Sequence, residues 1–397
     1  MLIMTKRSTS AIVWGCVVLA TMIGQANATE PHFASELVFP LNPKHNHAPG
    51  IVECPNGDLF ATWYRGAGER QADDVAVYAS WKKRGASEWS EPFVLADTPG
   101  FPDCNTALFV DRDQQLWLFY PTILANSWES SLTNFKIAKQ FDAPGSPRWM
   151  REGMILLKPD DFAEEARTKL DLELAPFKEK LQPKQVEGIR IARERLGEKL
   201  YQRLGWQPRC KPTQLPSGRI LLPLYTDTFS ISLMAITDDS GMTWHASKPL
   251  FGFGNIQPTV LRRNDGTLVA YMRENGQREK IRVCESSDQG ETWGPVGVSE
   301  LPNPGSGVDG IRLASGKWLI VYNDTTQGRN RLAVSLSSDE GHTWPVSRHL
   351  EDQASGSFHY PAVSQGADGT IHAIYSYFVE GGKSMKHAAF TEDWLRE

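Results

Sequence analysis

The sequence predicts an all-β protein, a six-bladed β-propeller with Asp-box repeats and one inserted helical hairpin. Two independent repeats lead to this prediction. A short pattern with an Asp, a Gly and a Trp occurs three times, and a polar turn between apolar strand-like runs occurs six times. Both recur at about 50 residues, a period typical of propeller blades. We therefore assign residues 29–397 to one propeller domain.

The first repeat fits the pattern S/T-x-D-x-G-x-T-W, at residues 237–244, 286–293 and 337–344. Its central aspartates, Asp239, Asp288 and Asp339, are 49 and 51 residues apart. An Asp with a Gly two residues later makes a tight turn, in which the carboxylate accepts backbone N–H bonds and the Trp packs beneath. The pattern predicts structural turns, and residues 80–89 fit a degenerate fourth copy without the Asp.

The second repeat is a turn between two apolar runs, and its six copies predict six blades. They lie at residues 56–57, 113–114, 217–218, 265–266, 315–316 and 368–369. Only one interval, 104 residues from the second copy to the third, departs from the period. It contains residues 159–205, where apolar residues recur at helical spacing and Pro183 can open a second helix. We expect an inserted helical hairpin, which serves as a solvated cover over hydrophobic surface, the alternative we favour, or as a lid that shapes the substrate site.

Composition excludes several classes of function. Lys and Arg number 42 against 47 Asp and Glu, so there is no basic excess for binding the nucleic-acid backbone, and we expect no nucleic-acid partner. His45 and His47 lie on one strand face, but no third ligand is near in sequence. We therefore expect no metal site and no cofactor, and we expect a monomer.

Residues 1–28 have the features of a signal peptide. Lys6 and Arg7 precede a mostly apolar run at residues 11–23, and small residues at 26–28 mark a cleavage site near Ala28. The run is shorter than the roughly 20 apolar residues of a membrane span. We expect a secreted or periplasmic protein with no membrane span. Four cysteines would remain, which permits two disulfides, although isolated cysteines in strand-like runs are more often buried thiols: Cys54, Cys104, Cys210 and Cys284.

Polar residues recur where the innermost strand of each blade begins. In a propeller these strands line the central axis and start at one shared face, so their first side chains converge on a site suited to a hydroxylated or charged small ligand. The polar residues at these starts include His47, Asn105, Lys211, Asn255, Gln257, Asp309, His359 and Tyr360.

Three arginines are expected at the same face, because Arg65 and Arg273 end second strands and Arg329 lies in a related loop. Guanidinium groups bind a carboxylate bidentately, so the three predict a clamp for an anion. The loop at residues 66–74 adds Asp73 and Asp74, each a candidate general acid over the polar pocket.

These features resemble the sialidase superfamily, in its Asp-box, sialidase-like branch of bacteria and plants. Beyond the Asp boxes, residues 47–57, 255–273, 301–323 and 358–377 look like that branch in order and spacing. The resemblance implies an exo-acting, retaining glycoside hydrolase that removes a terminal sialic acid or a related acidic sugar from a glycan. It also implies a Tyr nucleophile assisted by Glu, an Asp acid/base and three Arg that bind the substrate carboxylate.

Carried over by position, Tyr360 looks like the nucleophile, and Arg273 and Arg329 look like the second and third arginines. Asp73 or Asp74 looks like the acid/base. Two positions depart from the pattern, because His47 replaces the first Arg and Gln257 replaces the Glu.

The replacement of the Glu by Gln257 and of the first Arg by His47 each leads to a further expectation. Asp309, at the start of the preceding inner strand, is a candidate replacement for the Glu. His47 would bind an anion by charge only when protonated, so substrate affinity is expected to weaken as the pH rises through about 6.5.

Two other functions stay open. A uronate-directed propeller glycosidase or polysaccharide lyase would use Tyr360 with His47 or His359 for acid/base chemistry. A non-catalytic glycan-binding propeller would have kept the pocket without the Glu. Release of free sugar separates either enzyme from a binder, and an unsaturated product that absorbs in the near ultraviolet identifies a lyase.

Overall fold

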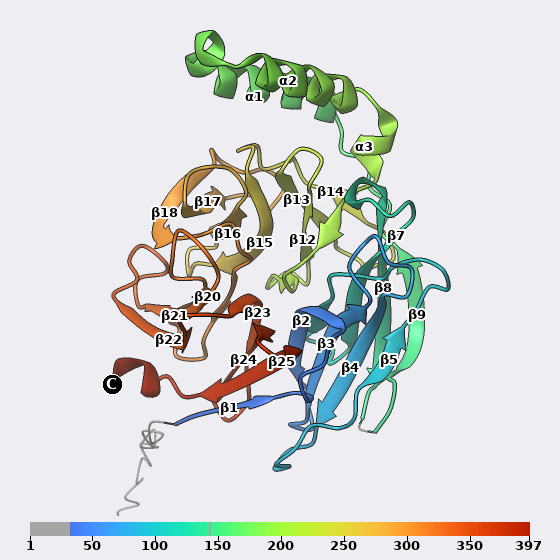
Figure 1. Cartoon of the computed structure of the whole chain (residues 1–397), viewed down its shortest axis with the longest axis vertical. Helices are drawn as coiled ribbons and strands as arrows, with labels where there is room; N and C mark the ends of the chain where they lie inside the picture. The colour runs from blue at the N-terminus through green and yellow to red at the C-terminus, as the bar shows by residue number, and fades with distance from the viewer. Residues whose placement is uncertain (1–31, 143) are drawn as a thin grey trace, which may run out of the picture.

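Six antiparallel sheets of four or five strands form a ring around a central axis (Figure 1). The computed structural model describes residues 32–142 and 144–397. The prediction of a six-bladed β-propeller is confirmed. The predicted signal peptide, residues 1–28, lies outside the described residues.

Blades 1 to 3 follow one another along the chain, with strands that pair in sequence order from the axis outwards. Blade 1 contains β2 (His45–Glu53), β3 (Leu59–Gly66), β4 (Ala76–Lys82) and β5 (Phe93–Ala96). Blade 2 contains β6 (Ala107–Val110), β7 (Leu116–Ile123), β8 (Ser131–Gln140) and β9 (Arg148–Met154). In blade 3, β10 (Gln207–Pro208) and β11 (Thr213–Gln214) both pair with β12 (Ile220–Thr226), which is followed by β13 (Ile231–Thr237) and β14 (His245–Ala246).

Blades 4 to 6 complete the ring. Blade 4 contains β15 (Asn255–Arg262), β16 (Leu268–Glu274), β17 (Lys280–Ser286) and β18 (Gly297–Pro302). Blade 5 contains β19 (Asp309–Arg312), β20 (Trp318–Tyr322), β21 (Arg331–Ser337) and β22 (Val346–Asp352). Blade 6 contains β23 (Ser357–Gln365), β24 (Ile371–Val379), β25 (Gly382–Phe390) and, at its outer edge, β1 (Phe33–Leu37). Because β1 pairs with β25, strands from both ends of the described chain build this blade and close the ring (Figure 1).

Apolar side chains fill the space between neighbouring blades. Separate buried clusters lie between blades 1 and 2, 2 and 3, 3 and 4, 4 and 5, 5 and 6, and 6 and 1. The strands that face this packing on both sides are almost continuously buried, as in β12, where every residue is buried. This packing stabilises the ring and holds the polar starts of the inner strands together at one face.

The Asp boxes form the turns that their pattern predicts. In the second box, Asp288 Oδ1 accepts hydrogen bonds from Ser286 Oγ at 2.8 Å and from the Thr292 backbone N–H at 3.0 Å. The boxes at Asp239 and Asp339 repeat these contacts. All three lie in the turns between the third and fourth strands of blades 3 to 5, so they fasten the blade edges.

The insertion forms helices that lie outside the ring beside blades 3 and 4 (Figure 1). In chain order they are α1 (Phe162–Leu174), η2 (Ala175–Lys180), α2 (Pro183–Leu196) and α3 (Lys199–Arg203). Phe162 and Leu196 pack into the cluster between blades 2 and 3, whereas Leu172 is 64% exposed. The base of the hairpin therefore covers hydrophobic surface, as the cover alternative expects, and its far end does not. Two further short 3₁₀ helices are η1 (Trp128–Ser130) and η3 (Trp394–Arg396).

The four cysteines predicted in the mature chain are all buried and unpaired: Cys54, Cys104, Cys210 and Cys284. The two disulfides that their number permits are not formed. Cys54, Cys104 and Cys284 lie in separate apolar clusters between blades, as expected for cysteines that act as small apolar residues.

Candidate functional site

Four inner strands share one backbone irregularity at the axis. Ala48, Asn105, Gln257 and Tyr360 all have left-handed backbones, with φ of 52°, 37°, 57° and 54°. In β2, β15 and β23 the pairing register shifts at this point, and a proline follows. A left-handed backbone costs a non-glycine residue roughly 1–2 kcal/mol, and such strain is concentrated at functional sites.

The side chains at three of these positions, Asn105, Gln257 and Tyr360, meet in one hydrogen-bonded network. The Tyr360 hydroxyl accepts hydrogen bonds from Arg273 Nη1 at 2.7 Å and from Gln257 Nε2 at 3.1 Å. Gln257 Nε2 also donates to the Tyr225 hydroxyl at 3.2 Å, which Asn105 Nδ2 reaches at 3.2 Å from the other side. Side chains from blades 2, 3, 4 and 6 therefore converge, as predicted for the inner-strand starts.

Three guanidinium groups surround the Tyr360 ring. Those of Arg209, Arg329 and Arg273 lie 5.1, 5.7 and 5.9 Å from the ring centre. Burial and the nearby positive charge of Arg273 lower the pKa of Arg329, because two cations are held close together in a half-buried site. This arrangement is suited to an anionic ligand that would neutralise them.

Arg209 has a role that the sequence did not reveal. It is 2% exposed, and it donates hydrogen bonds to the carbonyls of Tyr360, Pro361 and Pro49. Because these carbonyls belong to two bulged inner strands, Arg209 holds the backbone of blades 6 and 1 in place beneath the Tyr360 side chain.

His47 and His359 lie beside Tyr360 as neutral rings. The His47 ring centre is 4.3 Å from that of Tyr360 and 4.8 Å from that of His359. His47 Nδ1 lies 2.8 Å from Ser376 Oγ. Burial, and then repulsion between protonated His47 and the neighbouring basic groups His359, His45, Arg209 and Arg329, hold the pKa of His47 well below 6.5. The expectation that His47 becomes protonated near pH 6.5 is therefore wrong, because a buried imidazole among cations keeps no proton there.

Asp309 and Lys211, both sequence candidates, pair with each other deeper along the axis. Lys211 Nζ lies 2.7 Å from Asp309 Oδ2, which also accepts the Val363 backbone N–H at 2.9 Å. Asp309 Oδ1 accepts the Thr259 hydroxyl at 2.9 Å. Among the described residues no hydrogen bond joins Asp309 to the Tyr360 hydroxyl. The carboxylate is occupied in linking blade 5 to blades 3, 4 and 6, which makes it a poor replacement for the missing Glu.

Arg65 and Asn255 also lie apart from Tyr360. Arg65 donates to Asn46 Oδ1 at 2.6 Å and stacks on Phe39 at 4.5 Å and on Tyr78 at 4.8 Å. Asn255 is fully buried and donates to the Leu250 carbonyl at 2.9 Å. Of the three arginines expected to form one clamp, only Arg273 and Arg329 come together, because aromatic side chains of blade 1 hold Arg65.

Asp73 and Asp74 lie on the exposed part of the loop at 66–74. Asp73 Oδ1 accepts a hydrogen bond from Asn126 Nδ2 at 2.8 Å. Asp74 Oδ1 accepts the Ala67 backbone N–H at 2.8 Å, and Lys44 Nζ lies 3.3 Å from its Oδ2. The backbone hydrogen bond from Ala67 and the contact with Lys44 lower the pKa of Asp74, which disfavours the protonated form that a general acid needs.

Sequence reasoning missed three charged residues at this rim: Glu69, Arg70 and Asp227. Glu69 accepts the Tyr64 hydroxyl at 3.1 Å and pairs with His45 at 3.3 Å, and the Arg70 guanidinium lies 5.0 Å from the Trp128 ring centre. Asp227 directly follows β12, and Arg273 is the penultimate residue of β16 in the next blade. The sequence did hold a signal for Asp227. Arg273 was selected because it lies at the end of a second strand, and Asp227 directly follows the second strand of its own blade.

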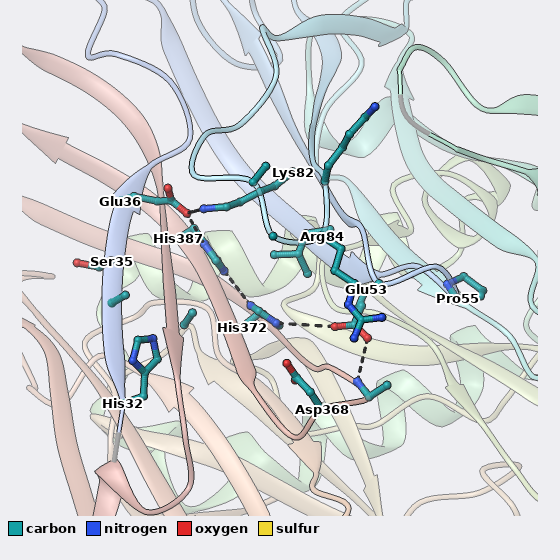
Figure 2. Close-up of a pocket in the computed structure, with 18 residues that line it drawn as sticks. His32, Ser35, Glu36, Glu53, Pro55, Lys82, Arg84, Asp368, His372 and His387 are labelled. Carbon is teal, nitrogen blue, oxygen red and sulfur yellow. Dashed lines mark hydrogen bonds and ion pairs between the residues drawn. The ribbon is translucent and has the colours of Figure 1, made fainter. Parts of the chain in front are cut away.

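A separate cavity of about 440 Å³ lies at the opposite end of blades 1 and 6 (Figure 2). We call it the seam cavity, and its labelled lining residues include Glu36, Glu53, Lys82, His372 and His387. His372 Nδ1 lies 3.0 Å from His387 Nε2, and His387 Nδ1 lies 3.2 Å from Glu36 Oε1. Burial acts to raise the pKa of Glu36, but hydrogen bonds from His387 and Lys82 lower it to about 2. These groups fasten β1 to both blades where the ring closes.

The sequence model of the BNR repeat-like domain matches residues 57–150 and 205–373, which is more than half of the chain. The chain belongs to the BNR repeat-like domain family. The predicted membership of the sialidase superfamily is thereby confirmed. The gap in the match coincides with the helical insertion of this BNR repeat-like protein.

Two relatives of this BNR repeat-like protein are named for activity on sialic acids. It is 30% identical over 169 residues to a sialidase of Micromonospora viridifaciens, covering 40% of this chain and 25% of the relative. It is 24% identical over 191 residues to an anhydrosialidase of Macrobdella decora, covering 43% of this chain and 25% of the relative. The matches thus span about a quarter of each relative's length.

The fold has many solved counterparts. One is the intramolecular trans-sialidase from Ruminococcus gnavus, with a TM-score of 0.66 and 12% identity over 89% of this chain and 96% of that one. At this identity the likeness shows the propeller fold alone. Among residues 32–142 and 144–397, no cluster of His, Cys, Asp and Glu is arranged to hold a metal ion, and no helix is long and apolar enough to cross a membrane.

Proposed function

We propose that this protein is an exported, sialidase-like exo-glycoside hydrolase that removes a terminal sialic acid or a related acidic sugar with retention of configuration. The observation that carries this proposal is the Tyr360 hydroxyl, 2.7 Å from Arg273 Nη1 and ringed by three guanidinium groups. Export is proposed from the signal-peptide features of residues 1–28.

The choice of a tyrosine follows from the charge of the substrate. Sialic acid bears its carboxylate on the anomeric carbon, so a carboxylate nucleophile would be repelled, whereas a phenol approaches without that cost. Arg273 and Arg329 are placed to bind the substrate carboxylate, which would offset the repulsion between their own charges. Both features favour an anionic sugar whose charge lies next to the reacting carbon.

Activation of Tyr360 must differ from that in sialidases with a Tyr–Glu pair. Gln257 occupies the Glu position, and its amide cannot take a proton from the phenol. Arg273 instead donates directly to the phenol oxygen, so it would stabilise the phenolate as that anion forms and again when it leaves. We expect slower turnover than a Tyr–Glu pair would give, because no base at Gln257 assists proton loss.

The test is a screen of the mature protein against 4-nitrophenyl glycosides of sialic and uronic acids, with analysis of the product. Release of free sialic acid in the α-configuration, lost in Tyr360→Phe, would support the proposal. A matched control is Tyr64→Phe, which removes another hydroxyl near the site while Tyr360 stays in place. Absence of any released sugar across the screen would contradict the hydrolase.

A second candidate is a lyase or glycosidase directed at uronates. The observation that favours it is the neutral pair His47 and His359 beside Tyr360, because a neutral imidazole can accept a proton. A lyase would give a product that absorbs in the near ultraviolet, and a hydrolase would not. Tight binding of an acidic glycan without any product would instead favour a glycan-binding propeller.

A further inference from the structure

Asp227 lies at the rim of the site around Tyr360 and is a candidate for acid/base chemistry there. It directly follows β12, the second strand of blade 3, as Arg273 lies at the end of the second strand of blade 4. Second strands of all blades return to the face that holds Tyr360, so Asp227 and Arg273 lie at the same face. The site described above has a nucleophile and anion-binding groups but no general acid, because Asp73 and Asp74 are engaged on the exposed loop.

Hydrogen bonds connect Asp227 to Tyr360 around the axis. Gln207 Nε2 donates to Asp227 Oδ2 at 3.0 Å, and Gln207 Oε1 accepts from Asn105 Nδ2 at 2.9 Å. Asn105 belongs to the network that reaches the Tyr360 hydroxyl through Tyr225 and Gln257. The network fixes one carboxylate oxygen of Asp227. Among the described residues no hydrogen bond reaches its Oδ1, which leaves that oxygen able to carry a proton.

Charged groups from several elements face the Asp227 carboxyl. Arg273 of β16 and Arg70 of the loop at 66–74 favour its ionised form, whereas Glu129 of η1 and Glu69 oppose it. Burial outweighs the two arginines and raises the pKa of Asp227 above its ordinary value. Glu69 differs, because hydrogen bonds and charges from His45 and Arg70 outweigh its burial and lower its pKa. Of these two carboxylates, Asp227 is therefore the better proton donor.

We propose that Asp227 is the general acid/base residue of this site, an inference that rests on the proposed hydrolase. In the first step Tyr360 loses its hydroxyl proton to solvent while Arg273 stabilises the anion, the resulting phenolate oxygen bonds to the anomeric carbon, and the glycosidic C–O bond breaks. Its electron pair goes to the aglycone oxygen, which takes the proton of Asp227. In the second step water attacks the anomeric carbon, gives its proton to Asp227, and the electron pair of the broken bond returns to the Tyr360 oxygen.

Substrate binding would strengthen this role. A bound carboxylate neutralises Arg273, which otherwise lowers the pKa of Asp227, and brings a further negative charge close by. Both effects favour the protonated acid in the complex. We therefore expect the alkaline limb of kcat to lie at higher pH than that of kcat/KM, because kcat reports the complex and kcat/KM reports the free enzyme.

The test uses two glycosides of N-acetylneuraminic acid that differ in leaving group. The 4-nitrophenyl glycoside leaves without protonation, whereas the galactose-linked sugar of sialyllactose needs an acid. Asp227→Asn keeps the size of the side chain and an acceptor for Gln207 but cannot supply a proton. It should lower kcat/KM on sialyllactose by ~10² or more and on the 4-nitrophenyl glycoside by less than ~10-fold. The alkaline limb on sialyllactose should also disappear.

Matched variants separate this assignment from its alternatives. Asp73→Asn, Asp74→Asn and Glu69→Gln should show no selective loss on sialyllactose, and a selective loss in any of them would overturn the choice of Asp227. Equal losses on both glycosides in Asp227→Asn would reduce Asp227 to a positioning residue and overturn the proposal. So would unchanged rates on both. A wild-type protein that cleaves neither glycoside, or Tyr360→Phe that cleaves both normally, would instead show that the proposed hydrolase has failed.

Discussion

Tyr360 and Gln257 occupy the same bulged position in two blades, and their side chains meet at 3.1 Å. Their φ angles are 54° and 57°, and each directly precedes a proline. Proline has no N–H to donate, so the strand ladder is interrupted at this point. The side chain at the bulge is thereby directed to the axis, where one position presents the candidate nucleophile and the other presents an amide in place of a base.

Removing the Tyr360 hydroxyl should abolish turnover without unfolding the protein. Tyr360→Phe keeps the ring that packs against His47, so we expect little change in melting temperature. We expect kcat to fall by at least ~10³ on whichever glycoside the screen returns. Steady-state kinetics and a melting curve measure both quantities. Turnover by Tyr360→Phe at the wild-type rate would show that Tyr360 is not the nucleophile.

Restoring a carboxylate at Gln257 should increase activity. In Gln257→Glu the new carboxylate can accept the Tyr360 proton at a hydrogen-bonding distance that already exists. We expect kcat to rise by about 10-fold or more, since a positioned base commonly contributes that much. Gln257→Leu is the control for altered packing. The gain should vanish in the Gln257→Glu, Tyr360→Phe double variant, and a gain that persists there would show that the carboxylate acts elsewhere.

His47 should not impose a pH dependence on substrate affinity between about pH 6 and 8. Its pKa lies well below 6.5 because of burial and neighbouring cations, so the ring is neutral across this range. His47→Gln preserves a neutral side chain that can hydrogen bond to Ser376. The KM profiles of the two proteins should be parallel on the same anionic glycoside. If substrate affinity weakened as the pH rose through 6.5 in the wild type alone, the prediction would be contradicted, and His47 would be the residue that senses substrate charge.

The seam cavity should make the protein sensitive to acid. Burial, followed by the charge of His387, lowers the pKa of His372 from 6.5 to about 3. The unfolded chain therefore binds a proton that the native protein does not between these values, so stability decreases as the pH falls through this range. His372→Gln should reduce the slope of unfolding free energy with pH by up to about 1.4 kcal/mol per unit between pH 4 and 6. Urea unfolding measures this slope, exposed His342→Gln is the control, and equal slopes for His372→Gln and wild type would contradict the prediction.

The Asp boxes should affect stability and leave chemistry intact. Asp288→Ala removes hydrogen bonds to Ser286 and Thr292 in the turn between β17 and β18, at the outer edge of blade 4. We expect a loss of about 1 to 2 kcal/mol of unfolding free energy, with unchanged kcat for the folded fraction. A lower kcat with an unchanged melting temperature would place the box in the functional site.

The sequence by itself determined the propeller. The Asp boxes and the six turns are local patterns, in which residues a few positions apart bond to one another, so their spacing reports the blade period directly. The 104-residue interval located the helical hairpin for the same reason. Position in the blade also predicted that Tyr360, Gln257, Arg273 and Arg329 would meet, because inner strands begin, and second strands end, at the same face.

Only the tertiary structure decided which charged groups serve the site. Arg65 satisfies the same strand-end rule as Arg273, yet Phe39 and Tyr78 hold it elsewhere. Asp309 begins an inner strand but is occupied by Lys211, whereas Asp227, which the pattern did not single out, faces Arg273 and Arg70. Direction, burial and partners of a side chain arise from contacts between residues that are remote in sequence. Periodicity determines where a residue lies along its strand. Three-dimensional packing determines where its side chain points and whether that side chain stays ionised.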